Sequence, residues 1–330
     1  MTLRPAPQVP ATVFITGAGG FIGRALATRL RELGAEVTGV DLVADPGAGI
    51  VQGSTADPST WAHALRGVEA VVHTAAIVGT TAPIDTAWEV NVLGTTKVID
   101  AAVNAGVRRF VHLSSIAAYG WDYPDYVTEE YPTRVTGGVS TYTDTKTNSE
   151  AAVLAQAGRG MTVSVVRPAD VYGPGSVWVR EPLKMIEKNQ MVLPKRGEGT
   201  FDVIYIDNFV DAMVLLLAAD TDLVAGEVFN FGEENRVTTG EYFGELARWK
   251  GGKIKTAPMA VLVPGLTVAG AALRRLGVKS ELGPALMHMF NRTSLVSNEK
   301  ARKVLGFEPL VGYGDGMERS RTWAATQGLL

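Results

Sequence analysis

The sequence contains no cysteine, which excludes disulfides, thiol nucleophiles and thiolate metal sites. The net charge is only −3, so there is no basic field to attract nucleic acid. The first ten residues include three prolines and lack the apolar core of a signal peptide, so we expect a cytoplasmic protein. The few histidines have no metal-ligand spacing, and no metal site is expected; they are His63, His73, His112 and His288.

Long uncharged apolar segments are also scarce. One runs from residue 257 to 273 and is followed by Arg274 and Arg275. It is slightly short for a membrane-spanning helix, and we expect Pro264 and Gly265 to interrupt it. We interpret the segment as a lid or pocket wall, with contact to a membrane surface as the alternative.

What is present is an alternation of short β-branched runs and helical stretches in a chain of 330 residues, 46% of them apolar. Strands are predicted at 12–16, 36–41, 70–73, 110–114 and 162–167, and helices at 20–33, 58–65, 88–105 and 142–157. This order predicts an α/β fold with a doubly wound parallel sheet of the Rossmann type. We expect a dinucleotide-binding domain at 1–173. A smaller substrate-binding region at 174–330 would return in part to the sheet, with helices at 208–219 and 239–249.

A glycine-rich turn lies between the first predicted strand and helix. Gly17 permits a tight turn, Gly20 lets the backbone approach a pyrophosphate, and Gly23 lets the helix pack on the sheet. The free N–H groups at the helix N-terminus would face the phosphates, with Phe21 and Ile22 alongside.

An acidic residue, Asp41, ends the second predicted strand, close to the spacing of about 20 residues that is typical of dinucleotide sites. Its carboxylate can accept both adenosine ribose hydroxyls and would repel a 2′-phosphate. NAD is therefore the expected cofactor. Arg24 and Arg29 on the following helix leave some tolerance for NADP open.

Tyr142 and Lys146 are four residues apart on a predicted helix, which places them on one face. A phenol titrates near about 10, and a neighbouring ammonium lowers its pKa. Ser114 and Ser115 end a predicted strand of the same sheet, where their hydroxyl groups would enter the cofactor cleft. Together these groups can move a proton beside a bound dinucleotide.

The combined pattern resembles the extended class of the short-chain dehydrogenase/reductase superfamily. The resemblance rests on the glycine turn, on Asp41, Tyr142 and Lys146, and on the segments 73–76, 91–95, 113–115, 119–120, 167–174 and 205–208, which follow the family's order and spacing. It covers most of the chain.

The resemblance implies a role for each matching residue. Tyr142 would be the general acid/base, Lys146 would hold the nicotinamide ribose and lower the pKa of Tyr142, and Ser115 rather than Ser114 would bind the substrate oxygen. His73 is interpreted as a packed strand residue. The family usually has an acidic residue near the adenine where this chain has Ser54. The residues expected to line the cofactor are Gly17, Gly20, Phe21, Ile22, Gly23, Asp41, Ser54, Thr55, Ala75, Ala76, Asn91, Tyr142, Lys146, Pro168 and Val171.

The branch of the family is less sharply defined. Dehydratases usually carry an acidic pair where this chain has Ile116 and Ala117, and sugar-nucleotide enzymes tend to have an arginine where Phe201 stands. The pattern is most similar to the branch that contains 3β-hydroxysteroid dehydrogenases, which implies an apolar, steroid-like alcohol or ketone. The expected substrate residues are Tyr119, Trp121, Tyr123, Trp178, Met185 and Phe201, with ordinary core packing as the alternative for about half of them.

Two other functions remain open, a nucleotide-sugar epimerase with tightly bound NAD and a non-catalytic dinucleotide sensor. The intact set of Ser115, Tyr142 and Lys146 argues against a sensor. A homodimer is also expected, because the helices at 88–105 and 142–157 carry more alanine, valine and leucine than one buried face requires.

Overall fold

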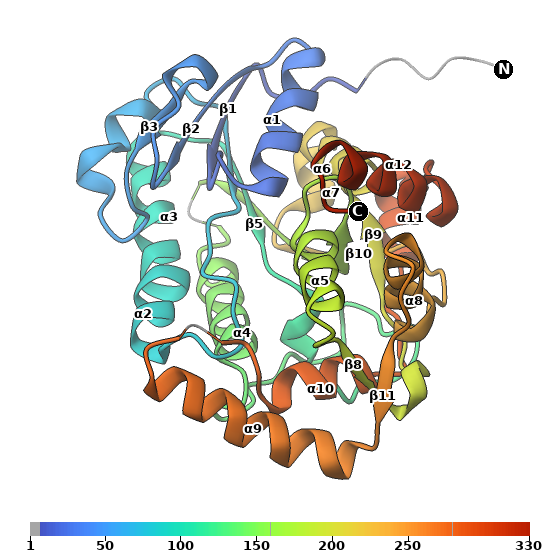
Figure 1. Ribbon diagram of the computed structural model, residues 1–330. Coiled ribbons are helices and arrows are strands. Elements are labelled where there is room, and N and C mark those ends of the chain that lie inside the picture. Colours follow the sequence, from blue (N-terminus) through green and yellow to red (C-terminus); the bar gives the residue numbers. More distant parts are fainter. Residues whose placement is uncertain (1–6, 159, 279) are drawn as a thin grey trace, which may run out of the picture.

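The fold is built around a parallel sheet of seven strands, in the order β10-β6-β5-β4-β1-β2-β3 (Figure 1). The computed structural model describes residues 7–158, 160–278 and 280–330. Positions 1–6, which belong to the ten N-terminal residues that lack the features of a signal peptide, lie outside the described residues. The strands of the sheet are β1 (Thr12–Thr16), β2 (Glu36–Asp41), β3 (Ile50–Gln52), β4 (Ala70–His73), β5 (Arg109–Leu113), β6 (Thr162–Pro168) and β10 (Glu227–Phe231).

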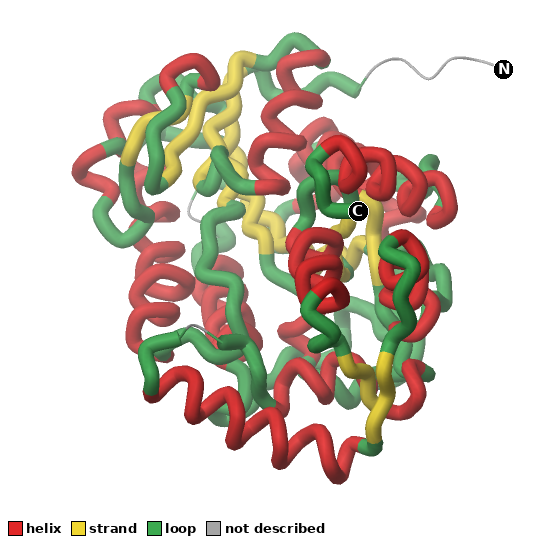
Figure 2. The backbone as a smooth tube through the Cα atoms, in the orientation of Figure 1, coloured by secondary structure: helices red, strands yellow, loops and turns green. Residues whose placement is uncertain are grey.

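Side chains alternate between two apolar cores, one on each face of the sheet. Along β1, Val13 and Ile15 face one core and Phe14 faces the other. The first core is shared with α1 (Phe21–Glu32) and α6 (Ile206–Ala218), and the second with α3 (Gly94–Asn104) and α4 (Thr141–Leu154). Figure 2 shows the strands enclosed by helices on both sides. The predicted doubly wound α/β fold is therefore confirmed.

Local signals explain several helix boundaries. The Ser140 side chain accepts a hydrogen bond from the Thr143 backbone N–H and begins α4. Thr238 and Glu241 form a capping box that begins α8 (Thr239–Trp249). The segment ahead of α3 begins with α2 (Ile84–Trp88) and continues as a π-helical turn over Glu89–Leu93. The predicted helix at 58–65 consists of two short 3₁₀ turns instead, Pro58–Thr60 and Ala62–Leu65.

The second half of the chain contributes most of the elements beside the sheet. Two small parallel sheets pair β7 (Asp170–Tyr172) with β9 (Val203–Tyr205), and β8 (Val192–Pro194) with β11 (Lys255–Ala257). The remaining helices are α5 (Val177–Glu187), α7 (Thr221–Val224), α9 (Met259–Arg275), α10 (Pro284–Asn291), α11 (Glu299–Leu305) and α12 (Tyr313–Thr326). β10 also comes from this half and pairs with β6, which brings the chain back to the main sheet.

The apolar segment at 257–273 differs from expectation, because α9 continues through Pro264 and Gly265 as one helix. Proline removes one backbone hydrogen bond inside a helix. Pro264 and Ala260 are both on the exposed side, where water can solvate the carbonyl group that lost its partner. Among the described helices, none combines the length and the apolar character needed to cross a membrane.

Candidate active site

A cavity of about 1200 Å³ lies at the carboxyl ends of the strands. Its wall contains residues that end or directly follow β1 to β6, and across from them residues of α5 and the start of α6. In open parallel sheets the carboxyl ends of the strands are where ligands bind. The order of strands therefore gathers segments that are far apart in the sequence around one space.

The glycine turn is packed so tightly that side chains would not fit. A Cβ atom on Gly17, which has φ +70°, would lie 2.9 Å from the backbone of Ala75, and one on Gly23 would meet the Gly17 carbonyl oxygen. The first turn of α1 has no acidic residue and no side-chain cap. Its N–H groups and the positive end of the helix dipole are thus available to an anion. Gly17, Gly20, Phe21, Ile22 and Gly23 all line the cavity.

Asp41 lies beside this turn on the cavity wall. Its Oδ2 accepts a hydrogen bond from the Gly19 backbone N–H at 2.9 Å, and its Oδ1 accepts one from the Leu42 N–H at 2.7 Å. The carboxylate is therefore fixed in orientation next to the phosphate-binding turn. Arg24 also lines this end, and its Nη1 is 3.4 Å from Asp45.

The loop after β4 forms the next part of the wall. Ala75 and Ala76 line the cavity, as do Ser54 and Thr55 after β3. Asn91 does not line it: its Oδ1 accepts a hydrogen bond from the Ile77 N–H at 2.7 Å, and its Nδ2 donates to the Ile77 carbonyl group and to Thr145. The expected cofactor contact of the Asn91 side chain is thus corrected, because these bonds hold the loop and α4 in place.

Helix α4 presents Tyr142 and Lys146 to the cavity on one face, as the spacing predicts. The Lys146 Nζ lies 5.8 Å from the centre of the Tyr142 ring and donates a hydrogen bond of 2.5 Å to the Leu113 carbonyl group. This bond connects the helix to the end of β5. Pro168 and Val171 complete the wall beyond them.

Burial governs the electrostatics of this pair. Desolvation raises the pKa of Tyr142 to about 12, with Ser115 hydrogen bonding acting in the opposite direction and Asp170 adding to the rise. Desolvation also lowers the pKa of Lys146 to about 8, against the attraction of Glu150. The expected lowering of the Tyr142 pKa is therefore not found in the protein alone. Burying a phenolate carries a desolvation cost, which the spacing of two residues along a helix does not reveal.

Both candidate serines line the cavity at the end of β5. The Ser115 Oγ accepts a hydrogen bond from the Ala117 N–H at 3.1 Å and caps the short turn Ile116–Tyr119. The Ser114 Oγ is buried and has no hydrogen-bond partner within the described residues. The Ser115 hydroxyl group acts on the Tyr142 pKa through hydrogen bonding, which places it with the tyrosine.

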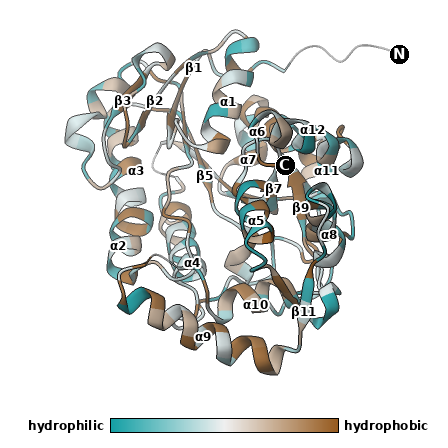
Figure 3. Ribbon diagram, in the orientation of Figure 1, coloured by the Kyte–Doolittle hydropathy of each residue, from teal (hydrophilic) through white to brown (hydrophobic). Residues whose placement is uncertain are grey.

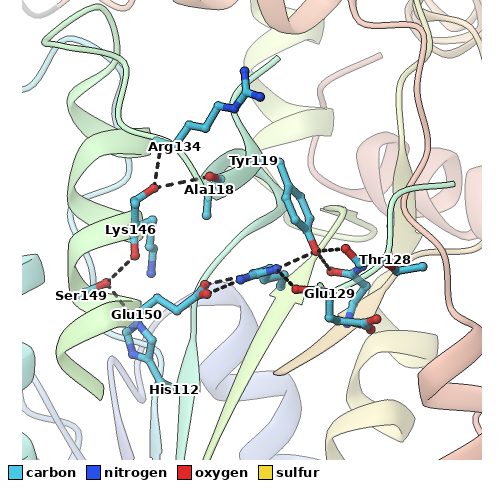
Figure 4. Close-up of polar contacts among 12 residues, drawn as sticks. His112, Ala118, Tyr119, Thr128, Glu129, Arg134, Lys146, Ser149 and Glu150 are labelled. Atoms are coloured by element: carbon cyan, nitrogen blue, oxygen red, sulfur yellow. Dashed lines mark hydrogen bonds and ion pairs between the residues drawn. The ribbon is translucent and has the colours of Figure 1, made fainter. Parts of the chain in front are cut away.

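A buried ion pair supports α4 from behind (Figure 4). Glu150 accepts two hydrogen bonds from the Arg167 guanidinium group of β6, one of them from Nε at 3.0 Å. Arg167 also lies 4.6 Å from the centre of the Tyr119 ring and donates to the Tyr119 hydroxyl group, which in turn donates to Asn230. Glu150 is one turn beyond Lys146, so this network anchors the helix that carries the reactive pair.

Two stacked histidines also lie behind the site. The His73 ring nitrogens are within hydrogen-bond distance of Thr16 at 2.6 Å and Thr95 at 2.9 Å. Burial, with a contribution from Lys146, lowers the His73 pKa to about 3 and also lowers that of His112. Neutral, buried and bonded to its neighbours, His73 is a packing residue of β4.

Most of the aromatic residues expected at the substrate lie elsewhere. Trp178 is on the cavity wall, but Tyr119, Tyr123 and Phe201 are buried in the core, so the expectation that they line a pocket is corrected. Phe201 packs against other aromatic rings, including Trp178 and Tyr242. Two further residues also lie off the wall: Trp121, which stacks on His288, and Met185, which packs on the core from α5.

Sequence reasoning missed a carboxylate on this wall. Asp170 follows β6 and lines the cavity, with 15% of its side chain exposed, and its Oδ2 accepts a hydrogen bond from the buried Arg292 at 3.2 Å. Burial raises the Asp170 pKa and Arg292 opposes that rise. An acidic residue two positions after β6, within the segment 167–174 that resembles the family, was the signal that could have identified it. Arg180 of α5 is a second charged wall residue without a sequence prediction.

Comparisons with known proteins identify the family of the chain. Residues 13–232 match the model of the NAD-dependent epimerase/dehydratase family. A 3β-hydroxysteroid dehydrogenase/Δ5→4-isomerase of Mycobacterium tuberculosis is 28% identical, and the similarity covers 90% of this chain and 86% of that protein. A 2-alkyl-3-oxoalkanoate reductase of Stenotrophomonas maltophilia is 27% identical, and the similarity covers 95% of this chain and 99% of that protein. Among solved structures, MoeE5 in complex with UDP-glucose and NAD is 25% identical with a TM-score of 0.76, covering 96% of this chain and 99% of that one.

Proposed function

Because this chain belongs to the NAD-dependent epimerase/dehydratase family, with the fold of the extended short-chain dehydrogenases/reductases, we propose that it interconverts a secondary alcohol and a ketone on an apolar substrate, using NAD. The observation that carries the proposal is the juxtaposition of Ser115, Tyr142 and Lys146 on one cavity wall with the glycine turn and Asp41. A dinucleotide on the turn would extend along this wall to the reactive pair.

NAD, when bound, supplies the acceptor or donor of a hydride. The substrate oxygen would lie between Ser115 and Tyr142. In the oxidative direction Tyr142 takes the hydroxyl proton, and Ser115 donates a hydrogen bond to the oxygen as charge develops on it. In the reductive direction Tyr142 donates that proton. Lys146, fixed by the Leu113 carbonyl group, would hold the nicotinamide ribose and place positive charge beside the phenol.

The preference for an apolar substrate is supported by the far wall. Val177, Trp178 and Ile206 are apolar, and the Asp170 carboxylate near Tyr142 would repel a diphosphate. Phe201 is buried away from the cavity and does not shape the substrate wall. A steroid-like alcohol fits such a wall, as the 3β-hydroxysteroid dehydrogenase relatives suggest.

A nucleotide-sugar epimerase is the second candidate, and Arg180 is the observation that favours it. This guanidinium is on the cavity wall opposite the sheet, where it could bind a diphosphate. The resemblance to MoeE5, solved with UDP-glucose and NAD, points the same way.

The test is to incubate the purified protein with NAD and to follow NADH absorbance with steroid, aryl and short-chain secondary alcohols. Net NADH formation supports the dehydrogenase, since an epimerase regenerates its NAD in each turnover. A parallel titration uses UDP-glucose. Tight binding of the sugar nucleotide without NADH from any alcohol would contradict the proposal.

Asp170→Asn provides a variant for substrate choice, because it removes the negative charge and keeps the shape. It also leaves the buried Arg292 without its ionised partner, so a thermal unfolding curve must show that the variant is folded. We expect it to improve UDP-glucose binding relative to the unaltered protein, and Asp122→Asn, an exposed carboxylate off the cavity wall, should have no effect.

A further inference from the structure

Helix α9 presents an apolar stripe to the outside of the protein. Val261 and Val268 are 64% and 70% exposed, and Leu276, directly after the helix, is 78% exposed. Pro264 and Ala272 are exposed between them at helical spacing, so the stripe runs along the whole length of α9. A soluble protein rarely leaves so long an apolar surface uncovered unless something binds there.

The opposite side of α9 is the one that packs on the protein. Leu262 and Gly270 are buried, and a Cβ atom on Gly270 would lie only 2.0 Å from the Leu282 carbonyl oxygen. Arg274 donates hydrogen bonds to the Ser280 and Leu282 carbonyl groups and secures the end of the helix. The helix is thus held by its inner side, and the outward stripe is not needed for the fold.

The stripe does not belong to the candidate active site. Within the described residues, no part of α9 lines the cavity, so the expectation of a pocket wall is corrected. Figure 1 shows α9 at the outer edge of the molecule, away from the main sheet, and Figure 3 shows its apolar residues along that edge. The chain after α9 does contact a cavity loop, because Glu281 accepts hydrogen bonds from the Thr80 N–H and hydroxyl groups.

Charge decides what kind of surface could cover the stripe. From 250 to 280 the sequence has no aspartate or glutamate, although acidic residues outnumber basic ones in the whole chain. Lys253 and Lys255 precede α9 and are exposed, and Arg274 and Arg275 end it, also exposed. An apolar helix side with cations at both ends is complementary to an anionic lipid surface.

A second copy of this chain would be a poor occupant. A twofold contact places the same surface on both partners, so either end of the stripe would bring cations against cations. We propose that α9 docks on an anionic membrane surface, with its outward stripe in the apolar part of the interface and with Lys253, Lys255 and Arg275 at the headgroups. The docking does not depend on the proposed reaction, although an apolar substrate could be collected from the same bilayer.

The experiment is flotation of the full chain with phosphatidylcholine vesicles that contain or lack phosphatidylglycerol, without substrate. We expect binding to the anionic vesicles, weaker binding at high salt, and little binding to neutral ones. Val261→Asp and Val268→Asp should each reduce the partitioning by about tenfold or more, because a charge replaces an apolar contact. Leu310→Asp, at a residue that is 78% exposed elsewhere on the surface, is the matched control and should bind normally.

The cations are tested separately. Arg275→Glu should reduce the partitioning by at least about fivefold. Arg66→Glu, at an exposed arginine about two hundred residues from α9 in the sequence, should leave the partitioning unchanged. Failure to float with anionic vesicles, or equal flotation of Val268→Asp, would overturn the proposal. If the unaltered chain does not float and Val268→Asp instead changes the oligomeric state, a second copy covers the stripe. A circular dichroism spectrum and a thermal unfolding curve that match those of the unaltered protein show that Val268→Asp is folded, so the outcome is independent of the proposed function.

Discussion

At the scale of single residues, the site depends on two titratable groups, Tyr142 and Lys146, whose neutral forms are favoured by burial. The Tyr142 phenol is half-buried on the cavity wall and desolvation raises its pKa to about 12, while Lys146 is buried and its pKa falls to about 8. Burial disfavours the charged form of both groups. Asp170, a third titratable group on the same wall, adds to the rise at Tyr142. The chemistry proposed here therefore requires the positive charge of the cofactor or of Lys146 beside Tyr142.

Tyr142→Phe keeps the aromatic ring and removes the proton that is transferred. Turnover should fall by about 10²–10⁴-fold, which is the usual contribution of general acid–base catalysis, while NAD binding persists. Steady-state rates and a cofactor titration measure the two effects. Tyr126→Phe, at an exposed tyrosine outside the cavity, is the control. Near-normal turnover of Tyr142→Phe would remove this residue from the mechanism.

Asp41 should set the choice between NAD and NADP. Its carboxylate is fixed by the Gly19 and Leu42 N–H groups, where it would meet either two ribose hydroxyls or a phosphate dianion. We expect tighter binding of NAD than of NADP, and Asp41→Ala should narrow the difference. Asp122→Ala, at an exposed carboxylate off the cavity wall, should keep this preference for NAD. Equal binding of both cofactors by the unaltered protein would contradict the assignment.

At the scale of elements, α4 is the part that joins chemistry to architecture. It carries Tyr142 and Lys146 on its cavity side, and Glu150 on the same helix pairs with Arg167 of β6. The charge of Glu150 also favours the Lys146 ammonium, against the effect of burial. Glu150 therefore serves both as an anchor and as a counter-charge.

Glu150→Gln should change the pH dependence of the rate. Lys146 is protonated below its pKa of about 8, so a rate that needs the ammonium falls as the pH rises through that value. Without the Glu150 charge the ammonium is less stable, and the fall should begin at lower pH. A pH profile of kcat/KM measures this shift, and an unshifted profile would count against it.

Stability must be controlled in that experiment, because the variant leaves Arg167 buried without its partner. Breaking a buried ion pair costs about 3–5 kcal/mol. The double variant Glu150→Gln with Arg167→Met removes both charges and should recover much of the free energy of unfolding. If the shift in pH profile persists in the double variant, it reports the loss of the counter-charge rather than loosened packing.

At the scale of the whole molecule, the two halves of the chain are less separate than their sequence patterns suggest. We propose that residues 1–173 mainly bind the cofactor and 174–330 mainly the substrate. Yet β10 pairs with β6 in the main sheet, and α6 packs with α1 in one core. The cavity wall likewise takes residues from both halves. The halves should therefore unfold together in one transition.

The homodimer remains a prediction at this scale. It would pair α3 and α4 with the same helices of a second copy, and light scattering should give twice the mass of the chain. Ala151→Arg, on the exposed side of α4, should convert the dimer to a monomer by burying an unpaired charge. Ala325→Arg on the exposed side of α12 is the matched control. A monomeric unaltered protein at high concentration would contradict the prediction.

The sequence by itself determined the elements with strong local signals. Strands such as Thr12–Thr16 and Ala70–His73 follow from short β-branched runs, and the glycine turn and the spacing of Tyr142 and Lys146 follow from local backbone geometry. Periodicity and turn chemistry act over a few residues, so a single sequence reveals them. The α/β fold follows from the order of these elements.

Only the tertiary structure decided which side chains face the cavity. Aromatic residues suit a core as well as a pocket, so the positions of Phe201 and Tyr123 depend on how distant elements pack. Asp170 meets Arg292 from a segment more than a hundred residues away, and Asn91 reaches Ile77 and Thr145 rather than the cavity wall. The sequence of α9 likewise does not show which side of the helix packs on the protein, because apolar residues occur on both sides. Burial arises from contacts between distant segments, and those contacts also set the pKa values that a local sequence argument cannot supply.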